Sequence, residues 1–128
     1  MTQNPIFCAI DTNDIHKATS LLSDIAPHIG GIKIGLEFFT SLGIKGIEEI
    51  KKFNKPLFID LKLYDIPNTV VAALRNILAL KPEYTTLHIS GGRRMLENCV
   101  EEKIRSNSST KLIGVTMLTS FDDRKLTK

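Results

Sequence analysis

Apolar residues gather in five short runs that recur at a nearly constant interval along the chain. These runs are rich in β-branched and aromatic residues, and they begin 25, 26, 27 and 27 residues apart. We expect each run to form a β-strand, because a short continuous apolar run is typical of a strand covered on both faces. The predicted strands span 6–10, 31–35, 57–61, 84–89 and 111–116.

The segments between these runs have the periodicity of amphipathic helices, with apolar side chains three or four positions apart. The segment after the second strand is less regular, and it predicts a short helical turn near Phe38 before a longer helix begins. Strands that alternate with helices through short connections indicate a parallel sheet. The predicted helices span 14–26, about 44–53, 68–80 and 93–106.

Two α/β architectures fit this order of elements: an open doubly wound sheet and a closed (β/α)8 TIM barrel. A repeat of about 26 residues extended to eight units gives slightly over 200 residues, which is near the usual size of such a barrel. The 128 residues supply five strands. If the fold is a barrel, residues 1–128 form a single partial domain with about strands 1–5, and the C-terminal strands are missing.

Composition and charge narrow the class of protein. The chain is 42% hydrophobic and 24% charged, which is typical of a globular domain. Its net charge is +3, but the Lys and Arg residues are scattered, which disfavours nucleic acid as a partner. The chain has two cysteines without metal-ligand spacing, no signal peptide, and no apolar run approaching the roughly 18 residues of a membrane span. We therefore expect a cytoplasmic protein that does not bind membranes.

Charged residues lie at the carboxyl ends of the predicted strands, where both architectures place their active sites. Asp11 follows the first strand, although it could instead belong to the cap of the next helix. Lys33 lies inside the second strand, where a buried ammonium group needs a charged partner. Asp60, Lys62 and Asp65 gather at the end of the third strand. We expect the two carboxylates to bracket the Lys62 ammonium group, so that the three groups keep one another ionised.

Such an array is a preorganised electrostatic device. A lysine between carboxylates can donate a proton to a developing carbanion, and a neighbouring carboxylate disfavours negative charge on a bound substrate. These properties fit a decarboxylation or another proton transfer at carbon. The sequence has no GxGxxG motif, no GxxxxGK[ST] motif and no pair of histidine ligands, so we expect neither a metal nor an organic cofactor.

The segment DLKLYDIPNT at positions 60–69 resembles the D-x-K-x-x-D-I-P-N-T signature of the orotidine 5′-phosphate decarboxylase family. The resemblance continues in order through AID ending at Asp11, IKIG around Lys33, LHISGG around His88 and VTMLTS ending at Ser120. It implies a (β/α)8 barrel that converts orotidine 5′-phosphate to uridine 5′-phosphate in de novo pyrimidine biosynthesis, without a metal or cofactor.

The resemblance also implies roles for individual residues. Lys62 protonates C6 of the pyrimidine, and Asp60 lies beside the substrate carboxylate and disfavours it electrostatically. Asp11 and Lys33 contact the ribose, and Thr119 contacts the nucleoside. The implied catalytic residues are Asp60, Lys62 and Asp65. The implied substrate-binding residues are Asp11, Lys33, Asp60, Leu61, Lys62, Leu63, Tyr64, Asp65, Ile66, Pro67, Asn68, Thr69 and Thr119.

The same resemblance implies a homodimer, because Asp65 and Thr69 reach into the partner subunit's site. Members of the family continue for roughly a hundred residues beyond the end of this sequence, and that region holds the loops that bind phosphate in such barrels. We therefore expect the chain to be the N-terminal part of the enzyme and to be inactive by itself, because binding energy from the phosphate is lost.

Two alternatives remain. One is a Mg²⁺-dependent sugar-phosphate decarboxylase or aldolase of the same superfamily, which shares D-x-K-x-x-D but not the IPNT extension that ends at Thr69. The other is a non-catalytic remnant that only binds nucleotide. The sequence argues against this remnant because it keeps all five charged residues of the array and its neighbours: Asp11, Lys33, Asp60, Lys62 and Asp65.

Overall fold

The computed structural model describes residues 3–126, in which five strands form one sheet. Neighbouring strands are all parallel and follow the order β1-β2-β3-β4-β5. Doubly wound sheets reverse their strand order at a switch point, whereas a barrel keeps it sequential. The sequential order therefore selects the barrel from the two predicted architectures. The strands are β1 (Phe7–Ala9), β2 (Gly31–Ile34), β3 (Leu57–Leu63), β4 (Tyr84–His88) and β5 (Lys111–Val115).

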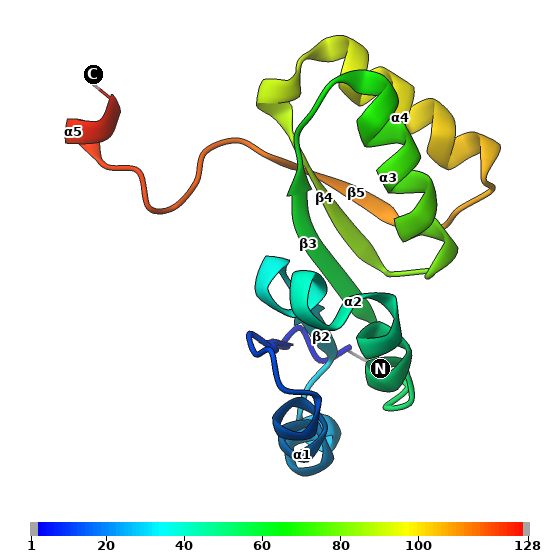
Figure 1. Cartoon of the computed structure of the whole chain (residues 1–128), viewed down its shortest axis with the longest axis vertical. Helices are drawn as coiled ribbons and strands as arrows, with labels where there is room; N and C mark the ends of the chain where they lie inside the picture. The colour runs from blue at the N-terminus through cyan, green and yellow to red at the C-terminus, as the bar shows by residue number, and fades with distance from the viewer. Residues whose placement is uncertain (1–2, 127–128) are drawn as a thin grey trace.

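Helices connect the strands in the predicted alternation (Figure 1). They are α1 (Ile15–Ile25), α2 (Leu36–Lys51), α3 (Pro67–Ala79), α4 (Arg93–Arg105) and the short α5 (Asp123–Leu126), with 3₁₀ turns η1 (Ala26–His28) and η2 (Ile89–Gly91). The two helical pieces predicted after β2 are joined in α2, which is interrupted only at Gly43. Gly43 has φ 59° and ψ −154°, a conformation that is essentially open only to glycine.

One face of the sheet is buried against the helices. Ile32, Ile34 and Ile59 are fully buried there with Phe38 of α2, in a hydrophobic cluster that also includes α1 residues. A second cluster joins α3 and α4 to β4 through Leu87 and its neighbours. Figure 1 shows α3 and α4 side by side over one half of the sheet, while α1 and α2 lie at the other half. The helices thus hold the strands in place by packing on this face alone.

The opposite face of the sheet carries aromatic rings near the amino ends of the strands. Phe7, Phe58 and Tyr84 contact one another edge-on, with ring centroids 5.8–6.4 Å apart. Lys33 pairs with Phe58 across the sheet, so its side chain belongs to the same face. Asp60 follows Phe58 by two residues, so it also belongs to this face. The charged residues therefore lie along the strands beyond an aromatic layer, on the face that forms the interior of a barrel.

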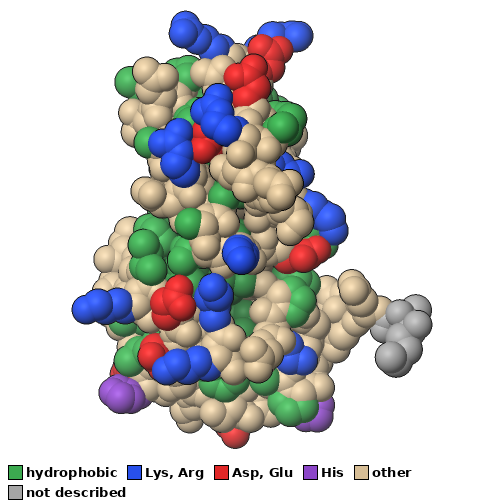
Figure 2. All heavy atoms as spheres, turned by 90° about the vertical axis from the view of Figure 1, so that its right-hand side faces the viewer, with side chains coloured by type: hydrophobic (Ala, Val, Ile, Leu, Met, Phe, Trp, Pro, Cys, Tyr) green, Lys and Arg blue, Asp and Glu red, His purple; other side chains and the backbone are tan. Residues whose placement is uncertain are grey.

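The outer surface carries charges of both signs. Figure 2 shows the right-hand side of Figure 1, where Lys and Arg side chains are interspersed with Asp and Glu. Some charges form exposed ion pairs, such as Lys52 with Glu49 at 2.8 Å, and pairs of this kind add little stability. Within residues 3–126, no helix has the length and apolar character needed to cross a membrane.

Candidate active site

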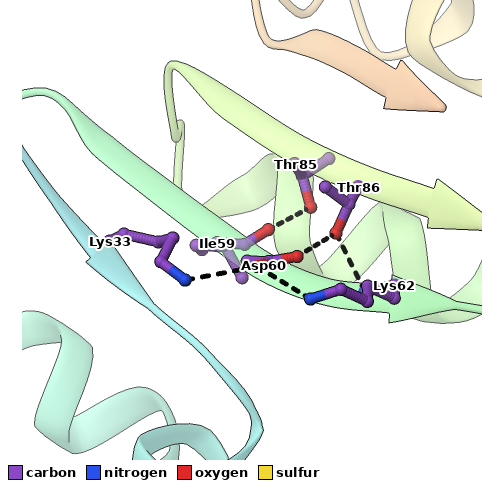
Figure 3. Close-up of polar contacts among 6 residues, drawn as sticks. All are labelled: Lys33, Ile59, Asp60, Lys62, Thr85 and Thr86. Carbon is purple, nitrogen blue, oxygen red and sulfur yellow. Dashed lines mark hydrogen bonds and ion pairs between the residues drawn. The ribbon is translucent and has the colours of Figure 1, made fainter. Parts of the chain in front are cut away.

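Asp60 is the centre of a polar network on the open face of the sheet (Figure 3). Its Oδ2 accepts a hydrogen bond from Lys62 Nζ at 2.9 Å and lies 3.5 Å from Lys33 Nζ. Its Oδ1 accepts a hydrogen bond from Thr86 Oγ1 at 2.8 Å. The Asp60 side chain is 10% exposed, whereas those of Lys33 and Lys62 are 31% and 40% exposed. A single, nearly buried carboxylate thus lies between ammonium groups from β2 and β3.

The surroundings of Asp60 keep it ionised. Burial disfavours its charged form, but hydrogen bonds from Lys62 and Thr86 and the charges of Lys62 and Lys33 outweigh this effect. The pKa of Asp60 is therefore lowered below the ordinary value of an aspartate. At neutral pH the site holds a fixed negative charge with a cation in hydrogen-bonding contact.

A bulge in β3 brings Lys62 to this carboxylate. Ile59 pairs with Thr85 and Leu63 pairs with Leu87, so β3 advances four residues while β4 advances two. Lys62 has φ 50°, in the left-handed region that non-glycine residues seldom adopt. Its backbone N–H donates to Thr86 Oγ1 at 2.9 Å. Unusual backbone conformations of this kind cluster at functional sites, where the surrounding structure must hold them.

Asp11 lies at the same edge of the sheet, in the loop after β1. A Cβ on Gly35 would lie 3.9 Å from Asp11 Oδ1 and 3.6 Å from the backbone oxygen of Asp60, so both residues border Gly35. The cap of α1 is Asp14, whose carboxylate accepts two backbone hydrogen bonds at 2.9 and 3.2 Å. Asp14, and not Asp11, is therefore the capping residue of α1.

Asp65 does not bracket Lys62 within this chain. Its Oδ1 accepts a hydrogen bond from the N–H of Ile66 at 2.6 Å, and its side chain is exposed. None of the ion pairs among the described residues joins Asp65 to Lys62. The observed array is thus the inverse of the expected one, with two ammonium groups around one carboxylate. The cause is the path of the chain, which leaves the sheet after Leu63 and turns into α3.

Leu61 and Leu63 point away from the Asp60 network. Each packs into a hydrophobic cluster on the helical side of the sheet. The third strand-end neighbour, Tyr64, is exposed and stacks on the His88 imidazole, with centroids 5.3 Å apart and an interplanar angle of 25°. His88 Nδ1 accepts a hydrogen bond from the N–H of Ser90 and thereby caps η2.

The remaining predicted residues lie at the start of α3 and after β5. Ile66 is the N-cap of α3 and is 66% exposed, and Pro67 occupies the first turn. Asn68 and Thr69 follow on the exposed side of that turn. Thr119 is exposed and belongs to the segment between β5 and α5. Figure 1 shows this segment extending away from the sheet.

Thr86 is the one member of the Asp60 network that the sequence interpretation missed. It lies in β4 and is 3% exposed. A signal was available, because Thr86 precedes His88 by two residues and so belongs to the same face of the strand. In the described part of the chain, His, Cys, Asp and Glu side chains do not form a group of three or more that could hold a metal ion.

A parallel sheet in sequential order, with charged groups at the ends of its middle strands, is the arrangement of (β/α)8-barrel enzymes. The sequence profile described as "Orotidine 5'-phosphate decarboxylase / HUMPS family" matches residues 4–128. The chain therefore belongs to this family.

Curated relatives agree with this assignment. The chain is 49% identical over 125 residues to a protein of Wolbachia from Brugia malayi named orotidine 5′-phosphate decarboxylase, and the match covers 98% of this chain and 55% of the relative. It is 46% identical over 123 residues to the protein of the same name from Erythrobacter litoralis, covering 96% and 54%. The chain thus spans about half the length of the curated relatives it matches.

Solved structures show the same partial coverage. The fold resembles that of orotidine 5′-phosphate decarboxylase from Lactobacillus acidophilus with a TM-score of 0.84 and 31% identity, over 98% of this chain and 58% of that one. These neighbours are TIM barrels, and the present chain corresponds to their first five strands. The prediction of a partial (β/α)8 barrel is confirmed.

Proposed function

We propose that this chain carries the charged part of an orotidine 5′-phosphate decarboxylase site, which converts orotidine 5′-phosphate to uridine 5′-phosphate in de novo pyrimidine biosynthesis. The observation that carries the proposal is the contact between Lys62 Nζ and the nearly buried Asp60 carboxylate at 2.9 Å. A proton donor beside a fixed negative charge suits the replacement of a carboxylate by a proton at one carbon. The similar proteins of Wolbachia and Erythrobacter litoralis, both named orotidine 5′-phosphate decarboxylase, support the same reaction.

In this mechanism the substrate carboxylate lies next to Asp60. Repulsion between the two negative charges disfavours the bound carboxylate and is relieved as CO₂ leaves. The bond between C6 and the carboxyl carbon breaks, and its electron pair remains on C6. Lys62 Nζ stabilises this developing charge and then transfers its proton to C6, after which the neutral amine regains a proton from solvent.

Lys33 has a supporting role in the proposed site. Its ammonium group lies 3.5 Å from the same Asp60 oxygen, so it helps to keep the carboxylate ionised while Lys62 gives up its proton. Lys33 and Asp11 contact the ribose, and Thr119 contacts the nucleoside. The backbone around Leu61 and Leu63 lines the site, because their side chains are engaged with the helices.

The proposal includes a homodimer in which Asp65 and Thr69 complete the partner subunit's site. The exposed apolar residues at the start of α3 support it: Tyr64 is 62% exposed and Ile66 is 66% exposed. Neighbouring exposed apolar groups are typical of surfaces that bind another protein. A dimer built on this surface would bury Tyr64, Ile66, Pro67 and Asn68.

The cysteines Cys8 and Cys99 are both unpaired, which supports a reducing cytoplasmic location.

The test compares two proteins for loss of orotidine 5′-phosphate absorbance. One is the 128-residue chain, and the other is that chain extended by the residues that follow the matched segment in the Wolbachia relative. We expect turnover only from the extended chain, because phosphate sites in barrels are built by loops after the seventh and eighth strands. Lys62→Met in the extended chain lowers turnover by about 10²–10⁴-fold.

Lys45→Met is the matched control, because Lys45 is an exposed lysine of α2 and has no part in the site. A folded extended chain without turnover contradicts the proposed function. Equal loss of turnover in both lysine variants contradicts the role of Lys62. A chelator in the same assay separates the Mg²⁺-dependent branch of the superfamily, since abolished turnover would favour that branch.

A further inference from the structure

Thr86 contacts both members of the proposed reacting pair through one hydroxyl group (Figure 3). Thr86 Oγ1 donates to Asp60 Oδ1 at 2.8 Å and accepts from the backbone N–H of Lys62 at 2.9 Å. The first bond fixes the side chain that supplies the negative charge. The second fixes the backbone of the residue that supplies the proton. Thr86 itself is 3% exposed, so water does not replace it readily.

The direction of these hydrogen bonds follows from the number of protons available. A threonine hydroxyl has one proton and two lone pairs. The N–H of Lys62 can only donate, so the hydroxyl uses a lone pair for it and its single proton points at Asp60 Oδ1. The other Asp60 oxygen faces the ammonium groups of Lys62 and Lys33. Both oxygens of Asp60 therefore face donors, and protonation of Oδ1 would set two donors against each other.

We propose that Thr86 is a positioning residue that holds Asp60 as an ionised acceptor in one orientation and pins the left-handed bulge at Lys62. The effect of Thr86 on catalysis rests on the proposed function. Its effect on the Asp60 carboxylate and on the backbone of Lys62 does not. Thr86 does not contact the reacting carbon. It acts through Asp60 and Lys62, because it keeps the carboxylate oxygen of Asp60 within hydrogen-bonding distance of Lys62 Nζ.

Two substitutions separate the hydroxyl from the shape of the side chain. Thr86→Val keeps the branched shape but removes the hydroxyl, so the N–H of Lys62 loses its acceptor and Asp60 Oδ1 loses its donor. Thr86→Ser keeps the hydroxyl and removes only a methyl group. Thr85→Val is the matched control, because Thr85 is a fully buried neighbour whose hydroxyl donates to the backbone oxygen of Ile59 at 2.8 Å, away from the carboxylate.

The primary experiment is a pH titration of the Asp60 carboxyl carbon by ¹³C NMR in the 128-residue chain and these three variants. We expect Thr86→Val to raise the pKa of Asp60 and to move the amide resonance of Lys62. In Thr86→Ser and Thr85→Val, the pKa of Asp60 and the amide resonance of Lys62 stay close to their values in the unsubstituted chain. Urea unfolding of Thr86→Val and Thr85→Val shows whether a difference in stability between the two variants accounts for the difference in their titrations. An unchanged Asp60 titration in folded Thr86→Val, or an equal change in Thr85→Val, overturns the proposal.

The second experiment measures kinetics in the extended chain described above. Loss of a hydrogen bond to a charged group predicts a kcat about 10- to 100-fold lower in Thr86→Val, with KM little changed and activity retained in Thr86→Ser. A drop in kcat that Thr86→Ser does not rescue overturns the positioning role. If the unsubstituted extended chain has no turnover, the proposed function fails, but the NMR titration still decides what Thr86 does to Asp60.

Discussion

Replacing Asp60 by asparagine tests the electrostatic network most directly. The side chain keeps its shape but loses its charge, and one oxygen becomes an NH₂ group. If the NH₂ group takes the place of Oδ2, it cannot accept the hydrogen bond from Lys62 Nζ, which lies 2.9 Å from Oδ2 in the structure. If the amide turns instead, its NH₂ group meets the hydroxyl of Thr86, whose proton is directed at Oδ1. In the first orientation donors face each other. In the second, the Thr86 hydroxyl has to turn its proton away from residue 60 to accept from the amide, so its hydrogen bond to the carboxylate is lost. In both orientations Lys62 and Lys33 lose their charged partner.

The structure also sets the size of the effect. Removing one partner of a fully buried charge pair costs about 3–5 kcal/mol, and a hydrogen bond to a charged group contributes about 1.5–3 kcal/mol. Asp60 is nearly buried, but Lys33 and Lys62 are 31% and 40% exposed, so water solvates the unpaired ammonium groups in part. We therefore expect Asp60→Asn to lower the free energy of unfolding by about 2 kcal/mol at neutral pH.

Urea unfolding of the 128-residue chain measures this difference as a lower midpoint at an unchanged slope. Asp65→Asn is the matched control, because Asp65 is an exposed aspartate of the same segment without a lysine partner among the described ion pairs. It should change the free energy of unfolding by less than about 0.5 kcal/mol. The double variant Asp60→Asn/Lys62→Met removes both members of the closer ion pair and leaves only Lys33 unpaired, so it should recover part of the lost stability.

The pH dependence has a definite sign. The pKa of Asp60 is lower in the folded chain than in the unfolded chain, so ionised Asp60 stabilises the fold at neutral pH. This stabilisation is complete above the unfolded pKa and is lost as the pH falls through the lowered folded pKa. The gap between the unsubstituted chain and Asp60→Asn should therefore close in the acid range, below about pH 4. A variant as stable as the unsubstituted chain at neutral pH, or a gap that persists in acid, would refute the reasoning.

Two further predictions concern residues outside the site. Glu102→Gln destabilises the fold at neutral pH, because the buried Glu102 carboxylate is held by Arg75 Nε at 2.7 Å and by Arg105 at 3.0 Å. Thermal unfolding should give this variant a lower Tm than Glu101→Gln, which is the control at an exposed neighbouring residue. The hydrogen bond from Arg75 lowers the pKa of Glu102, so the difference from Gln should shrink as the pH falls through that lowered value; equal Tm values at neutral pH contradict the prediction. Gly43→Ala lowers the free energy of unfolding by about 1–3 kcal/mol through backbone strain alone, because nothing lies within 4 Å of the added Cβ, and an unchanged urea midpoint would contradict this.

Much of the local structure could be predicted from the sequence because it depends on neighbours along the chain. The five apolar runs became the five strands, with ends that differ by at most two residues. The largest difference is β3, which continues to Leu63 rather than ending at 61, so Lys62 lies within the strand. Alternation of apolar and polar residues does not reveal a bulge, because the extra residues are specified by the partner strand. α3 likewise begins at Pro67, whose fixed φ suits the first turn of a helix.

The sequence by itself determined which chemical groups this protein has and where they fall along the strands, because apolar periodicity and strand-end charges are local properties. The segment DLKLYDIPNT was sufficient to indicate the family. Only the tertiary structure decided how the groups meet. It ordered the strands sequentially, placed Asp60 between two lysines, and turned Asp65 toward its own loop. It also brought Thr86, 26 residues after Asp60, to the same carboxylate. The physical reason is that these contacts cross strands, so they depend on register and bulge, which no single segment specifies.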